Sequence, residues 1–60
     1  MMTPAGLETV YETMAEQLDA IAPDKRELFM AKLVLLLSHD LADAARVRSL
    51  IREAAENLDA

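Results

Sequence analysis

The chain has 60 residues, of which 53% are hydrophobic and 28% charged, with one glycine, two prolines, no cysteine and a formal net charge of -5. The hydrophobic content is too high for a disordered chain, and the lack of cysteine excludes disulfides and thiol redox chemistry. We therefore expect one small folded domain over residues 1–60, whose negative charge disfavours nucleic acid as a partner.

The N-terminus has no Lys or Arg ahead of an apolar run, so it does not look like a secretory signal, and a cytoplasmic location is expected. The longest apolar run, Leu28 to Leu37, contains Lys32. As a helix it would rise only about 15 Å, roughly half the ~30 Å thickness of a hydrocarbon core. The sequence therefore predicts no membrane-spanning segment.

A first helix is predicted over residues 4–21. Thr3 can act as its N-cap, and Pro4 suits the first helical position because its missing N–H has no partner there in any case. Pro23 disfavours helical geometry in the residue before it, which ends the helix near Ile21. The apolar stripe of this helix, with steps of three and four residues, comprises Leu7, Val10, Tyr11, Met14, Leu18 and Ile21.

A second helix is predicted over residues 25–39. Asp24 and Glu27 have the spacing of a capping box, which would satisfy free N–H groups at its start. From Leu28 to Leu37 every residue except Lys32 is apolar. At ~100° per residue, these side chains surround the helix axis except near Lys32.

A third helix is predicted over residues 43–58, with Asp43 or Asp40 as its N-cap and Asp59 near its end. The turn before it is placed around Asp40 to Asp43, and Ser38 and His39 either finish the second helix or enter this turn. The apolar stripe of the third helix comprises Val47, Leu50, Ile51, Ala54 and Leu58.

These elements predict an all-α, three-helix up-down-up bundle. Two flanking stripes do not cover a helix that is apolar nearly all round, so we expect a homodimer in which the middle helices meet and form a six-helix assembly. The alternative is a monomer that packs closely enough to hide every apolar side chain. The predicted interface set consists of Phe29, Met30, Leu33, Val34, Leu36 and Leu37.

Acidic residues form a band on the first helix, away from its apolar stripe. One interpretation is a docking strip for a protein partner, another is a solvated face, and a third is pairing with Arg46, Arg48 and Arg52 of the third helix. The acidic band comprises Glu8, Glu12, Glu16 and Asp19.

Catalytic chemistry is not expected. Ser38, His39 and Asp40 are consecutive, so their side chains point ~100° apart on a helix and do not converge as a catalytic triad. His39 is the only histidine and there is no cysteine, so a metal site lacks ligands. The sequence thus predicts no catalytic, cofactor-binding or metal-binding residue and a protein that is not an enzyme.

The central Phe29-Met30-Ala31-Lys32-Leu33 segment, the Leu-rich run after it and the Val47 to Leu58 stripe resemble a family of short proteobacterial proteins classified as a domain of unknown function. The similarity covers almost the whole chain but departs at Ala42, where the family has glycine before the turn aspartate. The family implies no activity and no site residues. Similar proteins are often encoded beside flavin-dependent aromatic-ring hydroxylases, which implies an accessory role.

The sequence therefore predicts a non-enzymatic helical module for oligomerisation or protein interaction. A second hypothesis is an accessory subunit that docks on a catabolic enzyme such as a flavin-dependent aromatic hydroxylase. A third is a small DNA-binding regulator that uses the arginines of the last helix, although the acidic residues of that helix and the lack of a basic arm disfavour it.

Overall fold

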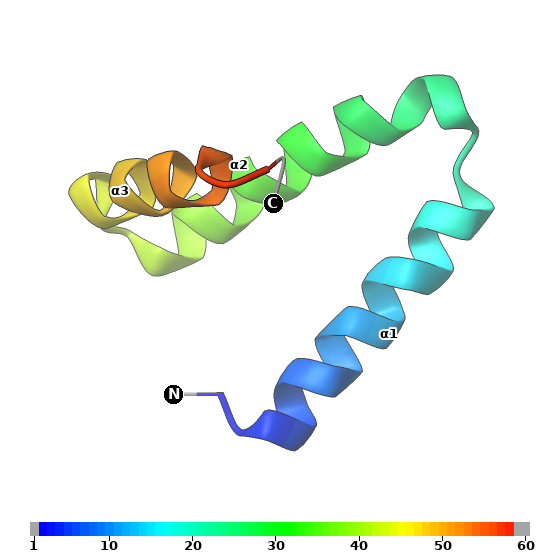
Figure 1. Ribbon diagram of the computed structural model, residues 1–60, viewed down its shortest axis with the longest axis horizontal. Coiled ribbons are helices and arrows are strands. Elements are labelled where there is room, and N and C mark those ends of the chain that lie inside the picture. Colours follow the sequence, from blue (N-terminus) through cyan, green and yellow to red (C-terminus); the bar gives the residue numbers. More distant parts are fainter. Residues whose placement is uncertain (1, 59–60) are drawn as a thin grey trace. The chain divides into compact units, whose positions relative to one another are not determined.

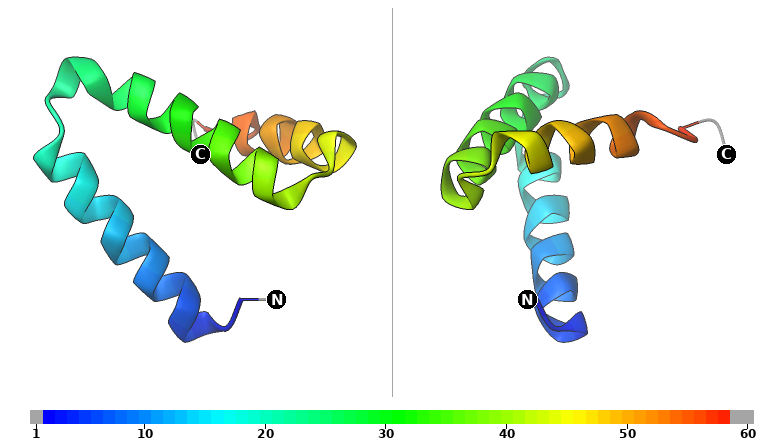
Figure 2. Two further views of the ribbon diagram at one scale, coloured as in Figure 1. Left: turned by 180° about the vertical axis from the view of Figure 1, so that it is seen from behind. Right: turned by 90° about the vertical axis from the view of Figure 1, so that its left-hand side faces the viewer.

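The computed structural model describes residues 2–58, and these are mostly helical (Figure 1). Helix α1 spans Pro4–Ala20, the short 3₁₀ helix η1 spans Pro23–Lys25, α2 spans Arg26–Leu41 and α3 spans Ala44–Ala55. No strand occurs in this part of the chain, so the predicted all-α class with three main helices is confirmed. Figure 2 shows the same helices from two further sides.

The chain divides into two compact units, Met1–Met30 and Ala31–Ala60. The first unit holds α1, η1 and the opening turn of α2. The second holds the rest of α2 together with α3. The division falls inside α2, so the middle helix belongs to both units.

The start of α1 follows from its first residues. The Thr3 side chain accepts a hydrogen bond from the backbone N–H of Gly6 at 3.0 Å, and Pro4 occupies the first turn. Both predictions for this end are confirmed. At the other end Ile21 is extended, and its N–H donates to the Gln17 carbonyl at 3.0 Å. The helix proper stops at Ala20, one residue before the predicted end.

The connection between α1 and α2 differs from the predicted capping box. Asp24 lies inside the 3₁₀ helix η1, which starts from Ala22 without a side-chain cap, and α2 follows directly at Arg26. Pro23 begins a tight turn that closes when the Lys25 N–H donates to the Ala22 carbonyl at 2.8 Å. The Arg26 side chain then donates to the Leu18 carbonyl at 2.9 Å and satisfies one free acceptor at the end of α1.

The turn between α2 and α3 is shorter than predicted. Helix α2 continues through Asp40 to Leu41, and Ala42 ends it with a φ of 55°. Asp43, rather than Asp40, is the N-cap of α3, since its carboxylate accepts from the Arg46 N–H at 3.0 Å. The predicted turn at residues 40–43 is thereby corrected to residues 42–43.

The end of α3 is also corrected. The helix closes at Ala55, and Glu56 is extended, whereas residue 58 was the predicted end. Leu58 therefore lies beyond the helix in a terminal turn, and Asp59 is outside the described residues.

No residue of the described part of the chain is fully buried. In the first unit the half-buried apolar side chains are those of Met14, Leu18, Ile21 and Phe29. In the second unit they are those of Leu33 and Val47. These six apolar side chains are partly shielded, and most of the apolar surface of the described residues faces solvent.

Candidate self-association surface

The apolar side chains of α2 form three lengthwise rows, because positions i, i+4, i+7 and i+11 share one side of a helix. The first row comprises Met30, Val34, Leu37 and Leu41. The second row comprises Phe29, Leu33 and Leu36 and ends in Asp40. The third row alternates between apolar and polar side chains, in the order Leu28, Lys32, Leu35 and His39. Together the three rows place apolar side chains on nearly every side of α2.

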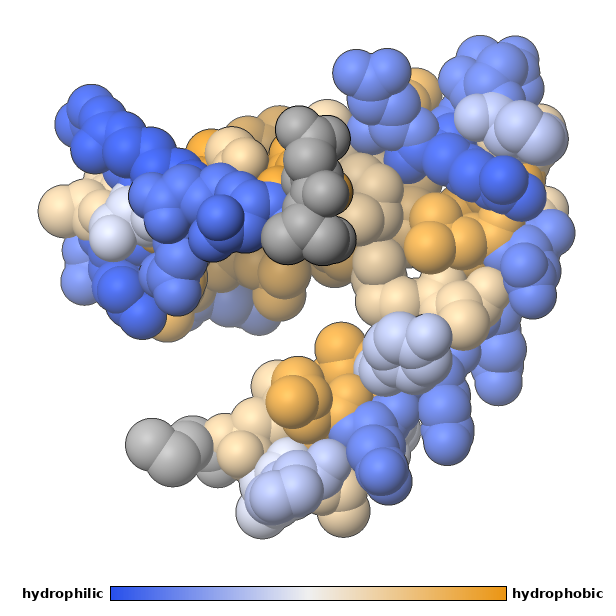
Figure 3. Space-filling model, in the orientation of Figure 1, coloured by the Kyte–Doolittle hydropathy of each residue, from blue (hydrophilic) through white to orange (hydrophobic). Residues whose placement is uncertain are grey.

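The exposure of these rows agrees with the expectation that a single chain leaves much of α2 in water. Val34 is 40% exposed, Leu37 58% and Leu36 60%, whereas Phe29 and Leu33 are half-buried. All members of the predicted interface set thus keep accessible surface. Figure 3 shows apolar side chains at the molecular surface over both α1 and α2.

The first row of α2 and the stripe of α3 together line an apolar groove of about 230 Å³, here called the α2–α3 groove. Both helices belong to the second unit, and Ser38 contributes the groove's one polar side chain. The apolar residues that line it are Val34, Leu37, Val47, Leu50, Ile51 and Ala54. The groove is open to solvent, since Ile51 is still 52% exposed.

Helix α1 presents two surfaces. Its apolar stripe remains accessible toward the N-terminal end, where Leu7 is 61% and Tyr11 75% exposed. The acidic band lies on another side of the helix, and all four of its carboxylates belong to exposed residues. In the first unit, α1 therefore presents an apolar stripe on one side and negative charge on another.

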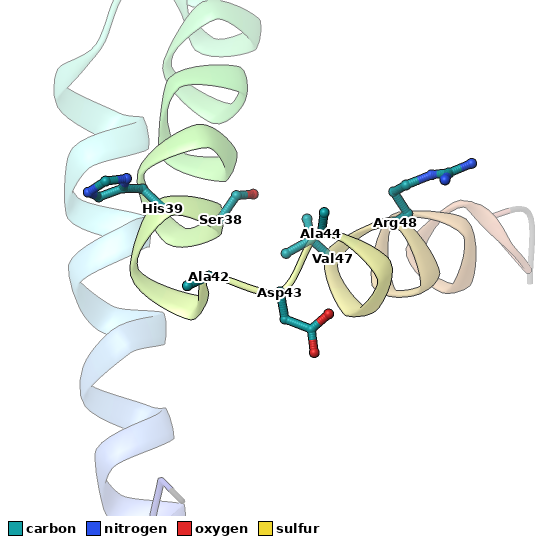
Figure 4. A pocket seen from close by; sticks show the side chains of 7 residues that line it. All are labelled: Ser38, His39, Ala42, Asp43, Ala44, Val47 and Arg48. Carbon is teal, nitrogen blue, oxygen red and sulfur yellow. The ribbon is translucent and has the colours of Figure 1, made fainter.

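A second depression, of about 590 Å³, surrounds the α2–α3 turn (Figure 4). Its polar side chains do not converge: the His39 imidazole, the Asp43 carboxylate and the Arg48 guanidinium point in three different directions. The Ser38 hydroxyl donates to the Val34 carbonyl of its own helix at 2.6 Å. Because this bond engages the hydroxyl proton, Ser38 is not aligned with His39 for nucleophilic attack.

Among residues 2–58 no group of three or more His, Cys, Asp or Glu side chains is arranged to hold a metal ion. Within that range no helix has the length and apolar character needed to cross a membrane.

Comparisons with known proteins give no further guide, since neither a family model nor a curated protein nor a solved structure matches the chain. The resemblance to a proteobacterial family of unknown function stays a prediction. The candidate site is therefore defined by the surface of the chain itself.

Three apolar side chains of the α2 rows are absent from the predicted interface set, namely Leu28, Leu35 and Leu41. Leu35 is 72% and Leu28 65% exposed, more than any member of that set. The signal in the sequence is their spacing of seven residues, which puts both on the side of α2 that carries Lys32. Leu28 and Leu35 belong to the third row, which is the most polar of the three because Lys32 and His39 share it.

Proposed function

We propose that the protein is a non-enzymatic helical module whose function is self-association, and that its working form is a homodimer. In this form the three helices of each chain make an up-down-up bundle, and the α2 helices of two chains meet and complete a six-helix body. The supporting observation is the exposure of the apolar rows of α2 in a single chain whose described part has no fully buried residue.

The energetic reason is the size of the exposed surface relative to the stability of so short a chain. Complete burial of a Leu or Val side chain is worth about 1.5–3 kcal/mol, so covering the exposed half of one gains about 1 kcal/mol. Covering the six side chains of the predicted interface set would then gain about 6 kcal/mol of free energy per chain. A 60-residue domain has a net stability of about 3–9 kcal/mol, so this gain is comparable to the whole.

Association has its own cost, about 4–15 kcal/mol in lost translational and rotational freedom. Twelve interface side chains, six from each copy, supply about 12 kcal/mol, which lies within that range. A stable dimer therefore needs these α2 rows and further apolar contacts beside them.

Size-exclusion chromatography with light scattering tests the proposal. The expected result is a species of about twice the 6.6 kDa chain mass at micromolar concentration, which dissociates only on strong dilution. A mass of one chain at all concentrations would overturn self-association. A stable complex formed only with another protein from the source cell would instead support the accessory-subunit hypothesis.

A further inference from the structure

The two edges of the α3 stripe carry different patterns of charge. At ~100° per residue, Arg46 and Glu53 lie about 20° apart around the helix, on the edge formed by Leu50. Arg48 and Arg52 lie on the opposite edge, which no acidic residue of α3 shares. One edge of α3 is therefore mixed in charge, and the other is basic.

Arg46 and Glu53 are too far apart to pair within one helix. Their spacing corresponds to a rise of about 10 Å, whereas side chains of one helix pair at spacings of about three or four residues. Both residues are exposed, and the apolar side chain between them, Leu50, is 38% exposed. The Leu50 edge thus presents two opposite charges around an accessible apolar side chain.

A second copy of α3 is the partner that the Leu50 edge matches. When two-fold symmetry brings the same edge of two antiparallel helices together, the sequence order is reversed across the contact. With the axis beside Leu50, Arg46 of each chain meets Glu53 of the other, so both charge pairs attract. A parallel contact would instead bring Arg46 against its own copy. An antiparallel contact through the basic edge would bring Arg48 against Arg52, so both alternatives join like charges.

The Leu50 edge of α3 lies on the same face of the second unit as the second row of α2. The depression at the α2–α3 turn is lined by Ser38 of α2 and Arg48 of α3, so the basic edge of α3 lies on the Ser38 side of α2. Leu33 and Leu36 of the second row lie about 140–160° around α2 from Ser38. The second row and the Leu50 edge therefore share the opposite face, and Leu36 is 60% exposed on it.

We propose that this face of the second unit binds the same face of a second copy, with the two α2–α3 pairs antiparallel and Arg46 of each chain paired with Glu53 of the other. The proposal rests on the self-association proposed above and specifies its geometry. The α2 helices then meet through their second rows, and Leu50 supplies one of the apolar contacts that these rows need beside them.

Charge reversal at the two positions tests the pairing. Arg46→Glu and Glu53→Arg each create like charges at both contacts, so each variant alone should raise the dimer Kd about tenfold. A chain with both substitutions has opposite charges again and should return to within about threefold of wild type. An equimolar mixture of the two single variants should do the same through a mixed dimer. The single substitutions shift the net charge in opposite directions, so a loss common to both does not arise from net charge.

Arg48→Glu is the matched control, because it makes the same change of charge on the basic edge. It should alter the dimer Kd by less than about threefold. Both single variants are expected to stay folded, since they place a negative charge near the start of α3 and a positive charge near its end, as the helix dipole favours. Circular dichroism verifies this.

The outcomes separate the pairing from the proposed function. If the wild-type chain is a monomer, both proposals fail. If the single variants dimerise as tightly as wild type, or if the chain with both substitutions stays as weak as they are, the pairing is refuted while a dimer through α2 remains. If Arg46→Glu weakens the dimer and Glu53→Arg does not, the arginine pairs with another group and the pairing is also refuted. An equal loss in Arg48→Glu would refute it as well.

Cysteine cross-linking keeps the proposal testable if a charge-reversed variant does not fold, since the natural chain has no thiol. Leu50→Cys places a thiol beside the two-fold axis, where it meets its own copy, and should link two chains on air oxidation. Ile51→Cys, on the opposite edge of the stripe, is the matched control and should link poorly. Equal linking of the two variants would contradict the proposed face.

Discussion

Truncation of Leu36 to Ala tests the role of the α2 rows in the dimer. Leu36 is 60% exposed in the single chain and belongs to the second row of α2. The change removes three carbon groups worth about 0.8 kcal/mol each, or about 2.4 kcal/mol when a fully exposed side chain becomes buried. The fraction still open to a partner reduces this to about 1.4 kcal/mol per chain, and two chains lose about 3 kcal/mol.

A loss of about 3 kcal/mol corresponds to an increase of about a hundredfold in the dimer Kd. Calorimetric dilution of the dimer measures this Kd, and circular dichroism verifies that the variant stays helical, as expected because Ala favours helices. The matched control is Leu35→Ala at the next position. Leu35 is more exposed but lies on the side of Lys32, so its truncation should change Kd by less than about threefold.

The reasoning would be refuted if Leu36→Ala left the Kd at the wild-type value. An equal or larger effect of Leu35→Ala would also refute it, because the interface would then lie on the third row.

Three further predictions concern the turns. Ala42 has a φ of 55°, a left-handed conformation that glycine adopts without strain. Ala42→Gly should therefore stabilise the chain by about 1 kcal/mol and raise Tm by about 4–8 °C. The control, Ala45→Gly within α3, should instead lower Tm. Asp43→Ala should cost about 1 kcal/mol in thermal unfolding, since its carboxylate caps α3, and Asp43→Asn should restore most of the loss. Arg26→Met should cost about 0.5–1 kcal/mol through the lost bond to the Leu18 carbonyl, and Lys25→Met, which removes the same charge, should cost less. An unchanged Tm in Asp43→Ala or Arg26→Met would contradict a stabilising role of the corresponding hydrogen bond. An unchanged Tm in Ala42→Gly would contradict backbone strain at Ala42.

The starts of α1 and α3 were predictable from the sequence because they depend on local chemistry. Thr3 and Asp43 each cap a helix with a side-chain oxygen, and Pro4 tolerates the first helical position. Pro23 likewise marks the break after α1 through its effect on the preceding residue. These signals act over three or four residues and need no tertiary contact.

The helix ends were less predictable. Residues 38–43 include no glycine, so the sequence does not mark which residue takes a left-handed conformation. In the structure this residue is Ala42. At the end of α3, Leu58 continues the apolar stripe, but Glu56 leaves the helix before it. A last helical turn has free carbonyl groups and little to stabilise it, so stripe periodicity overestimates its length.

The candidate site was predictable in part. The apolar excess of α2 follows from composition and helical period alone, and the exposure of its rows agrees with it. The α2–α3 groove was not predicted, because it depends on how the stripe of α3 meets the first row of α2. Its lining by Ile51 and Ala54 requires the geometry of the turn at Ala42 and Asp43.

The central claim is that a second copy of the chain covers the apolar rows of α2. Sedimentation equilibrium of the wild-type protein, from micromolar to millimolar concentration, tests this claim most directly. We predict a reversible equilibrium between one chain of 6.6 kDa and a species of twice that mass, with the larger species dominant through most of the range. A single species of one chain mass throughout the range would contradict the claim.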